Sequence, residues 1–105
     1  MVFSRSEELW VEYCRALGLN LSRVRAEAGL SQEYVARAAG LATFTYQKLE
    51  KGESNPGDPA NPRLQTLVSL ALVLDLDITE MLPPIPHTLA RRLRARPGVD
   101  LPTTA

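Results

Sequence analysis

Residues 29–52 read GLSQEYVARAAGLATFTYQKLEKG, and this stretch decides the fold. It predicts two short helices joined by a tight turn at Gly40-Leu41-Ala42. Gly40 stands where such a turn needs a positive φ angle, which glycine adopts without steric cost. Ala36 is small enough for the second helix to pack closely on the first. The centre of the chain is therefore predicted to be a rigid pair of helices.

Capping patterns upstream of this stretch predict two further helices. Residues 4–7, Ser-Arg-Ser-Glu, form a capping box that starts a helix. That helix is expected to end near Leu17, with Gly18 closing it in a left-handed turn. The next helix is expected to follow Asn20 and to end at Gly29.

Downstream, three prolines between residues 56 and 62 predict a loop over residues 54–61, because proline lacks an amide donor and disfavours helix in the residue before it. Asn61 is the expected N-cap of an apolar helix, with Pro62 at its first position. Further helices are expected over residues 62–74, 77–82 and 88–95. No β-hairpin signal was found, so the predicted fold class is all-α.

Four short motifs follow one another in this pattern: Leu30-Ser31-Gln32-Glu33, Ala39-Gly40-Leu41, Leu49-Glu50-Lys51-Gly52 and Asn55-Pro56. Together they resemble the lambda-repressor/Cro-like helix-turn-helix family, also called the xenobiotic-response-element family, over about residues 21–82. The resemblance implies a five-helix bundle whose third helix lies in the major groove of DNA. Those helices would begin at Asn20, Ser31, Ala42 or Thr43, Asn61 and Asp77.

The resemblance also divides the chain into three parts. Residues 1–18 are expected to form an added N-terminal helix and residues 19–82 the helix-turn-helix domain. Residues 83–105 are rich in proline and arginine and are expected to form a basic C-terminal extension.

A helical wheel of the third helix of that bundle separates two faces at roughly 100° per residue. The face expected to point inward carries Ala42, Thr45, Tyr46 and Leu49. The outward face carries Thr43, Phe44, Gln47, Lys48 and Lys51. Gln47 can pair with an adenine edge, and Lys48 can donate to O6 and N7 of guanine. Thr43 or Phe44 can contact a thymine methyl group.

The resemblance assigns DNA contacts to particular residues. Three of them fall where the base contacts of the family cluster: Thr43, Phe44 and Lys48. Ser31 and Gln32 lie at a helix N-terminus that would face a phosphate, since free amides and the helix dipole favour an anion there. Arg63, at the end of the proline-containing loop, is a further phosphate contact. For Phe44 a second interpretation stays open, in which the ring folds back onto the core or onto a partner.

The resemblance further implies a structural ion pair between Arg25 and Glu50, which would tie the first helix of the family core to the third. Tyr46 occupies a position that is usually aliphatic in the family. If Tyr46 is buried, its hydroxyl must find a hydrogen-bond partner or a water molecule.

The formal net charge is zero, with 12 basic and 12 acidic residues, whereas DNA-binding proteins usually carry excess positive charge. The charge is nevertheless unevenly distributed. Among the charged residues of 54–82, only Arg63 is basic and the others are acidic. The C-terminal extension carries Arg91, Arg92, Arg94 and Arg96. Two interpretations of this arginine run stay open: it is a mobile tail that increases solubility, or it binds the phosphates of DNA.

Other classes of protein find little support in the sequence. Cys14 is the single cysteine, so it cannot form an internal disulfide, and it is expected to pack in an apolar face. His87 has no cysteine or carboxylate at ligand spacing, so we expect no metal site and no cofactor. No set of base, nucleophile and oxyanion donors suggests an enzyme. No apolar segment is long enough for a membrane span, so a cytoplasmic, nucleoid-associated protein is expected.

The helix over residues 62–74 is apolar almost all round. Its expected inward stripe is Leu64, Leu67, Val68, Ala71 and Leu74. Leu70, Leu72 and Val73 extend the apolar surface, and a helix that is apolar on every side is usually buried on every side. The cover must be the N-terminal helix with Trp10 and Tyr13, the C-terminal segment, or a second copy of the chain. We therefore hypothesise a homodimer.

The sequence thus predicts a transcriptional regulator that binds double-stranded DNA at a palindromic operator through residues 43–51. One alternative is an autoregulator of the antitoxin or restriction-controller type that pairs with a partner protein. Another is an adaptor that binds proteins and no DNA.

Overall fold

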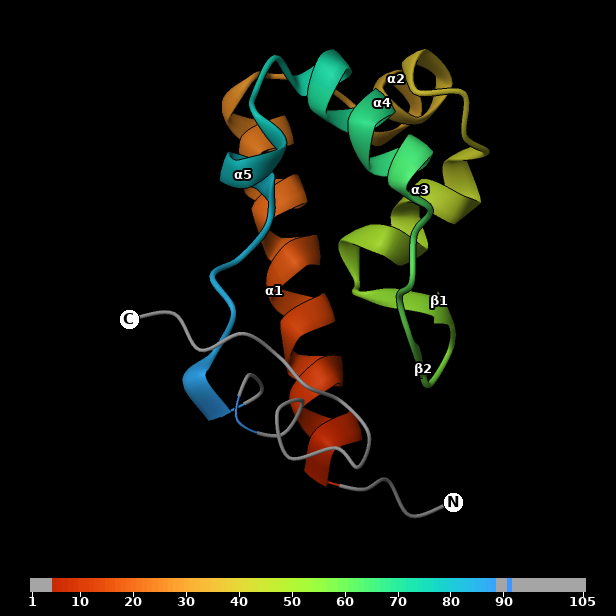
Figure 1. Cartoon of the computed structure of the whole chain (residues 1–105). Coiled ribbons are helices and arrows are strands. Elements are labelled where there is room, and N and C mark those ends of the chain that lie inside the picture. Colours follow the sequence, from red (N-terminus) through yellow and green to blue (C-terminus); the bar gives the residue numbers. More distant parts are fainter. Residues whose placement is uncertain (1–4, 89–90, 92–105) are drawn as a thin grey trace.

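The computed structural model describes residues 5–88 and 91. The elements in this part of the chain are α1 (Arg5–Glu27), α2 (Gln32–Ala38), α3 (Thr43–Glu50), β1 (Glu53–Asn55), β2 (Asp58–Pro59), α4 (Leu64–Leu74) and α5 (Ile78–Met81). Figure 1 shows α1 as one long helix, with α2, α3 and α4 gathered around its C-terminal half. The all-α fold class is confirmed, and the short hairpin is a minor addition. Among the described residues, no helix combines the length and apolarity needed to span a membrane.

α1 continues through the position where a helix end was predicted. Gly18 lies inside the helix, and a Cβ atom there would overlap the backbone carbonyl group of Glu50. Gly18 therefore serves a close approach between α1 and the end of α3. Asn20 also lies inside α1, where its side-chain amide donates to the carbonyl oxygen of Met81 at 3.0 Å. The predicted boundary between residues 18 and 19 falls within one continuous helix.

The segment after α3 contains the β-hairpin that sequence analysis did not find. β1 and β2 are antiparallel, and Gly57 makes the turn between them with a φ of 87°. Pro59 is tolerated because each strand of a two-stranded hairpin is an edge strand with free amide positions. The Cys14 thiol donates to the carbonyl oxygen of Ala60 at 3.1 Å. This bond fixes the base of the hairpin against α1.

The turn between α2 and α3 forms as predicted. Ser31 is the N-cap of α2, and its hydroxyl oxygen accepts a hydrogen bond from the backbone amide of Tyr34 at 3.0 Å. Gly40 has a φ of 76°, the positive value that the turn requires. Val35 and Ala36 are completely buried, whereas Tyr34 is exposed. α2 is therefore held mainly by its small side chains.

α4 begins two residues later than predicted, at Leu64, with Arg63 in place of Asn61 as its N-cap. Its buried side includes Leu70, Ala71 and Leu74. The predicted inward positions of Leu64 and Val68 are wrong, since both side chains are exposed. Leu72 is exposed as well. We call the row of Leu64, Val68 and Leu72 the α4 stripe, because a spacing of four residues puts them on one side of the helix.

The chain after α5 returns along the N-terminal half of α1 (Figure 1). α5 begins with a capping box of Asp77 and Glu80. The Tyr13 hydroxyl donates to the carbonyl oxygen of Pro83 at 2.8 Å, and the Trp10 ring stacks on Tyr13 with centroids 5.5 Å apart. Tyr13 thus joins α1 to the segment after α5. The predicted basic helix over residues 88–95 lies mostly outside the described residues, as do Arg92, Arg94 and Arg96.

Candidate nucleic-acid interface

Two large side chains anchor α3 in the core. Tyr46 is completely buried and Leu49 nearly so, as the helical wheel predicted. The inward positions predicted for Ala42 and Thr45 are wrong, because both are exposed. Thr45 is roughly 100° from Tyr46 around the helix, which puts it at the edge of the buried face. α3 therefore buries a narrower strip than the wheel suggested.

An ion pair joins α3 to α1, between the two residues named from the sequence. Arg25 donates to both carboxylate oxygens of Glu50, from Nε at 2.6 Å and from Nη2 at 3.1 Å. Its Nη1 donates to the carbonyl oxygen of Leu30 at 2.9 Å. The side chains are only 17% and 6% exposed. A bidentate, charge-assisted contact of this kind fixes the relative orientation of the two side chains as well as the distance between them.

Burial and charge act against each other at this ion pair. Burial by itself would raise the pKa of Glu50, but the hydrogen bond from Arg25 and its neighbours outweighs burial and holds that pKa below its usual value. Tyr46 lies beside the pair, and burial raises the pKa of its phenol, with Glu50 adding to the effect. Among the described residues, the Tyr46 hydroxyl has no hydrogen-bond partner of acceptable geometry.

A chain of side-chain amides extends the ion pair toward the surface. Gln32, at the start of α2, donates from Nε2 to Glu50 Oε1 at 2.8 Å. Gln47 in turn donates from Nε2 to Gln32 Oε1 at 3.2 Å. Gln32, which we expected at a phosphate, is thus engaged with α3, and Gln47 has one of its amide hydrogens committed. This chain of contacts locks α2 and α3 into one rigid unit.

The outward face of α3 presents the other residues expected at the base edges. Thr43 is the first residue of the helix and is half-buried, whereas Lys51 follows the helix as its C-cap and is exposed. Phe44 is 68% exposed. Lys48, one turn further, places its ammonium group 4.9 Å from the centroid of the Phe44 ring. The aromatic ring thus lies on the surface and not in the core.

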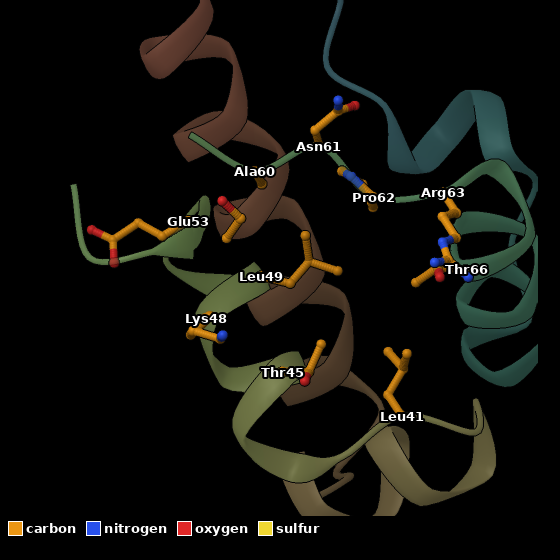
Figure 2. Close-up of a pocket in the computed structure, with 11 residues that line it drawn as sticks. Leu41, Thr45, Lys48, Leu49, Glu53, Ala60, Asn61, Pro62, Arg63 and Thr66 are labelled. Atoms are coloured by element: carbon orange, nitrogen blue, oxygen red, sulfur yellow. The ribbon is translucent and has the colours of Figure 1, made fainter. Parts of the chain in front are cut away.

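A groove lies between α3, the hairpin and the start of α4, and Figure 2 shows side chains lining it from both sides. Its volume is about 340 Å³. Lys48 lines the α3 side and Arg63 the α4 side, so two cations share one groove. Thr45 and Asn61 also line it, and the sequence analysis named neither as a contact. The exposure of Thr45 at the edge of the wheel is the signal that could have identified it.

The remaining predicted contact, Ser31, uses its hydroxyl oxygen to cap α2. Of the seven other predicted contacts, Thr43 and Lys51 lie at the two ends of α3, and five fall into three groups. Phe44 and Lys48 touch each other on the outward face, Gln32 and Gln47 belong to the amide chain, and Arg63 lies across the groove. The surface that results is polar and basic around a single aromatic ring, and it is held by a rigid pair of helices.

Comparison with known proteins decides the family. The helix-turn-helix family model HTH_3 matches residues 21–81, which is more than half of the chain. The chain belongs to the helix-turn-helix family. It is a regulator of the lambda-repressor/Cro-like type, as the motifs indicated. α2 and α3 are the two helices that give the family its name.

Two relatives support this assignment of a helix-turn-helix protein. An uncharacterized HTH-type transcriptional regulator, y4dJ, of Sinorhizobium fredii is 32% identical over 74 residues, covering 70% of this chain and 88% of that protein. Among solved structures, the restriction-modification controller protein C.AhdI of Aeromonas hydrophila is similar, with a TM-score of 0.57 and 29% identity. The match covers 65% of this chain and 94% of C.AhdI. The N-terminal part of α1 lies outside the family match.

Proposed function

We propose that this helix-turn-helix protein is a sequence-specific transcriptional regulator that binds a palindromic operator as a homodimer, with α3 in the major groove. The observation that carries the proposal is the α3 surface. Its inner side is fixed by Tyr46, Leu49 and the Arg25–Glu50 ion pair, so the outer side chains have a fixed place from which to meet a duplex. A major groove about 12 Å wide admits an α-helix, and each base pair presents a distinct pattern there.

In this proposal the basic side chains of the groove have different roles. Lys48 lies on the outer face of α3 and donates to a base edge, whereas Arg63 lies across the groove and binds a phosphate. Base contacts specify the sequence and phosphate contacts position the protein. Lys51, exposed at the end of α3, adds a second phosphate contact.

The homodimer is proposed on the α4 stripe. Leu64 and Leu72 are 71% and 77% exposed, and Val68 lies between them at 44%. Tyr13, which with Trp10 was one of the covers considered from the sequence, bonds to Pro83 after α5, and Trp10 stacks on Tyr13. A second copy of the chain would cover the stripe in a twofold, self-complementary contact. Two recognition helices about 34 Å apart would then meet successive turns of one face of the duplex.

Selection of bound sequences from a random duplex pool tests the proposal. We expect an inverted repeat to be enriched, and fluorescence anisotropy should show a steep loss of affinity with added salt, because phosphate contacts release counterions. Sedimentation at tens of micromolar should show a dimer. No enriched sequence and no salt dependence would instead support an adaptor that binds proteins.

Two variants separate the roles within the groove. Arg63→Ala should weaken binding uniformly across sequences and reduce the salt slope by about 1, whereas Lys48→Ala should relax the preference at one base pair of each half-site. Arg23→Ala is the matched control, since Arg23 is exposed on α1 outside the groove and pairs with Glu27. Equal effects of Lys48→Ala on all sequences would contradict the base contact.

A restriction-controller role is a second candidate, and one observation favours it. The similarity to C.AhdI extends over 94% of that controller protein, so this chain contains nearly all of its fold. An autoregulator of this kind should bind the DNA directly upstream of its own gene. A footprint there, compared with an equally long fragment from inside the gene, checks this candidate.

A further inference from the structure

The outward face of α3 carries a contact between an aromatic ring and a cation. Phe44 is 68% exposed, and the ammonium group of Lys48 lies 4.9 Å from the centroid of its ring. A single exposed phenyl ring needs no explanation by itself. This ring, however, is paired with the lysine that lies on the proposed reading face, so the two side chains present one combined surface.

Phe44 and Lys48 can each make further contacts while they are paired with each other. A cation within about 6 Å of a ring centroid is attracted to one face of the ring. The edge of the ring and its opposite face remain free for an apolar contact. The ammonium group has three donors, so contact with the ring leaves donors for acceptors elsewhere. The pair thus offers an apolar surface and a charged donor a few ångströms apart.

Only one group on the major-groove edges of the base pairs is apolar, the methyl group at C5 of a pyrimidine. The other exposed groups are hydrogen-bond donors and acceptors, and a phenyl ring that covered them would remove their water without replacing its bonds. The strongest acceptors for an ammonium group in that groove are O6 and N7 of guanine. The chemistry of the pair therefore fits a guanine next to a pyrimidine that carries a C5 methyl group.

We propose that Phe44 and Lys48 act as one reading unit, in which the ring contacts a pyrimidine C5 methyl group and the ammonium group donates to a guanine in a neighbouring base pair. This inference rests on the proposed function. The two groups lie 4.9 Å apart and base pairs stack about 3.4 Å apart, so the pair of side chains can reach two neighbouring base pairs. Thymine and 5-methylcytosine present the same methyl group, and the experiment distinguishes them.

The test uses the full chain and the duplex enriched from the random pool. Each thymine of one half-site is replaced in turn by uracil, and each cytosine by 5-methylcytosine, and affinity is measured by anisotropy. For the wild type we expect one position at which the methyl group strengthens binding about fourfold, the value of one buried methyl-sized group. Replacing the neighbouring guanine by 7-deazaguanine, which lacks N7, should also weaken binding.

Variants connect that position to the two residues. Phe44→Ala should bind the methylated and unmethylated forms equally, and Lys48→Met should lose the sensitivity to 7-deazaguanine. Tyr34→Ala is the matched control, because Tyr34 is an exposed aromatic residue of α2, and it should keep the wild-type methyl effect. A purely structural role of Phe44 would lower affinity for both forms alike and leave their ratio unchanged.

The outcomes separate the inference from the proposed function. Sensitivity to uracil identifies thymine as the ligand, and a gain only on cytosine methylation identifies 5-methylcytosine. Specific binding without any methyl effect, or a methyl effect that persists in Phe44→Ala, would overturn the inference and leave the proposed function standing. If the wild type enriches no sequence, both fail together. A Phe44→Ala variant that loses its dimer in solution would assign the ring to a protein contact and also overturn the inference.

Discussion

α3 and α4 both present an exposed face, and the two faces have opposite chemistry. The α3 face combines a hydroxyl, a phenyl ring and two lysines, whereas the α4 stripe is entirely aliphatic. Beneath α3 lies a polar anchor, the Arg25–Glu50 ion pair with its chain of amides. Beneath the α4 stripe lie only apolar residues such as Leu70 and Leu74.

This difference shows how the same small bundle can serve two kinds of contact. A helix that reads base edges must be held in one orientation, and a buried charged hydrogen-bond network is directional. A helix that meets another protein surface gains mostly from apolar area, which is non-directional. The comparison therefore predicts that damage to the polar anchor affects the fold, whereas damage to the stripe affects assembly.

Removal of the anchor should have the largest effect. Glu50→Ala leaves the part-buried Arg25 without its carboxylate partner and is expected to lower the free energy of unfolding by up to about 3–5 kcal/mol. Urea denaturation followed by circular dichroism measures this. The control is Glu27→Ala, which breaks the exposed Arg23–Glu27 pair and should cost no more than about 1 kcal/mol. Equal losses of unfolding free energy in Glu50→Ala and Glu27→Ala would contradict the stabilising role of the Arg25–Glu50 ion pair.

Damage to the stripe should change assembly and leave the fold intact. Leu72→Asp puts a charge in the proposed dimer contact and is expected to raise the dimer dissociation constant more than about tenfold, with an unchanged urea midpoint when both proteins are measured dilute enough to be monomeric. Sedimentation across a concentration series measures the constant. Leu19→Asp is the control, because Leu19 is a similarly exposed leucine on α1 outside the stripe. If both variants dissociate alike, the stripe is not the interface.

Acid should weaken the anchor but leave the stripe intact. The pKa of Glu50 is lower in the folded protein than its usual value, so the pair stabilises the fold at neutral pH. That contribution is lost as the pH falls through the folded-state pKa, because the unfolded chain binds the proton more readily. The free energy of unfolding should hold from neutral pH down to about pH 5 and fall below that, and it should fall less in Glu50→Gln. If the free energy of unfolding had the same pH dependence in the wild type and in Glu50→Gln, the loss of stability in acid would not come from Glu50.

The smallest effect is expected at the unsatisfied hydroxyl beside the anchor. Tyr46→Phe removes a buried group that has no hydrogen-bond partner among the described residues, so it should raise the free energy of unfolding by up to about 1 kcal/mol. The matched control is Tyr13→Phe, which removes a bond to Pro83 and should cost about 1 kcal/mol. A loss of stability in Tyr46→Phe would show that the hydroxyl has a partner.

Local motifs could be read from the sequence wherever a single residue fixes the backbone. Gly40 has the predicted positive φ, and α2 and α5 begin directly after Ser31 and Asp77, where helix starts were expected. The ion pair could be named because the resemblance supplied its two positions. The DNA contacts remain predictions, since the structure holds no duplex.

Glycine and proline were misread where their effect depends on distant neighbours. Gly18 was predicted to end a helix, but it lies in α1 because the carbonyl group of Glu50 leaves no room for a Cβ atom. The prolines around Gly57 predict a loop, but this segment forms a hairpin. Its base is held by the hydrogen bond from the Cys14 thiol to the carbonyl oxygen of Ala60. Propensity alone carries no information about such contacts.

By itself, the sequence determined the family, the tight turn and the composition of α3, because these depend on short-range backbone geometry and on recognisable motifs. The tertiary structure alone decided which side of α4 is buried. On α4 nearly every position is apolar, so periodicity could not select a face, and contacts with the rest of the bundle left Leu64, Val68 and Leu72 outside. Packing also decided that Gln32 donates a hydrogen bond to Glu50, because hydrogen bonds between helices depend on how the helices are placed relative to each other.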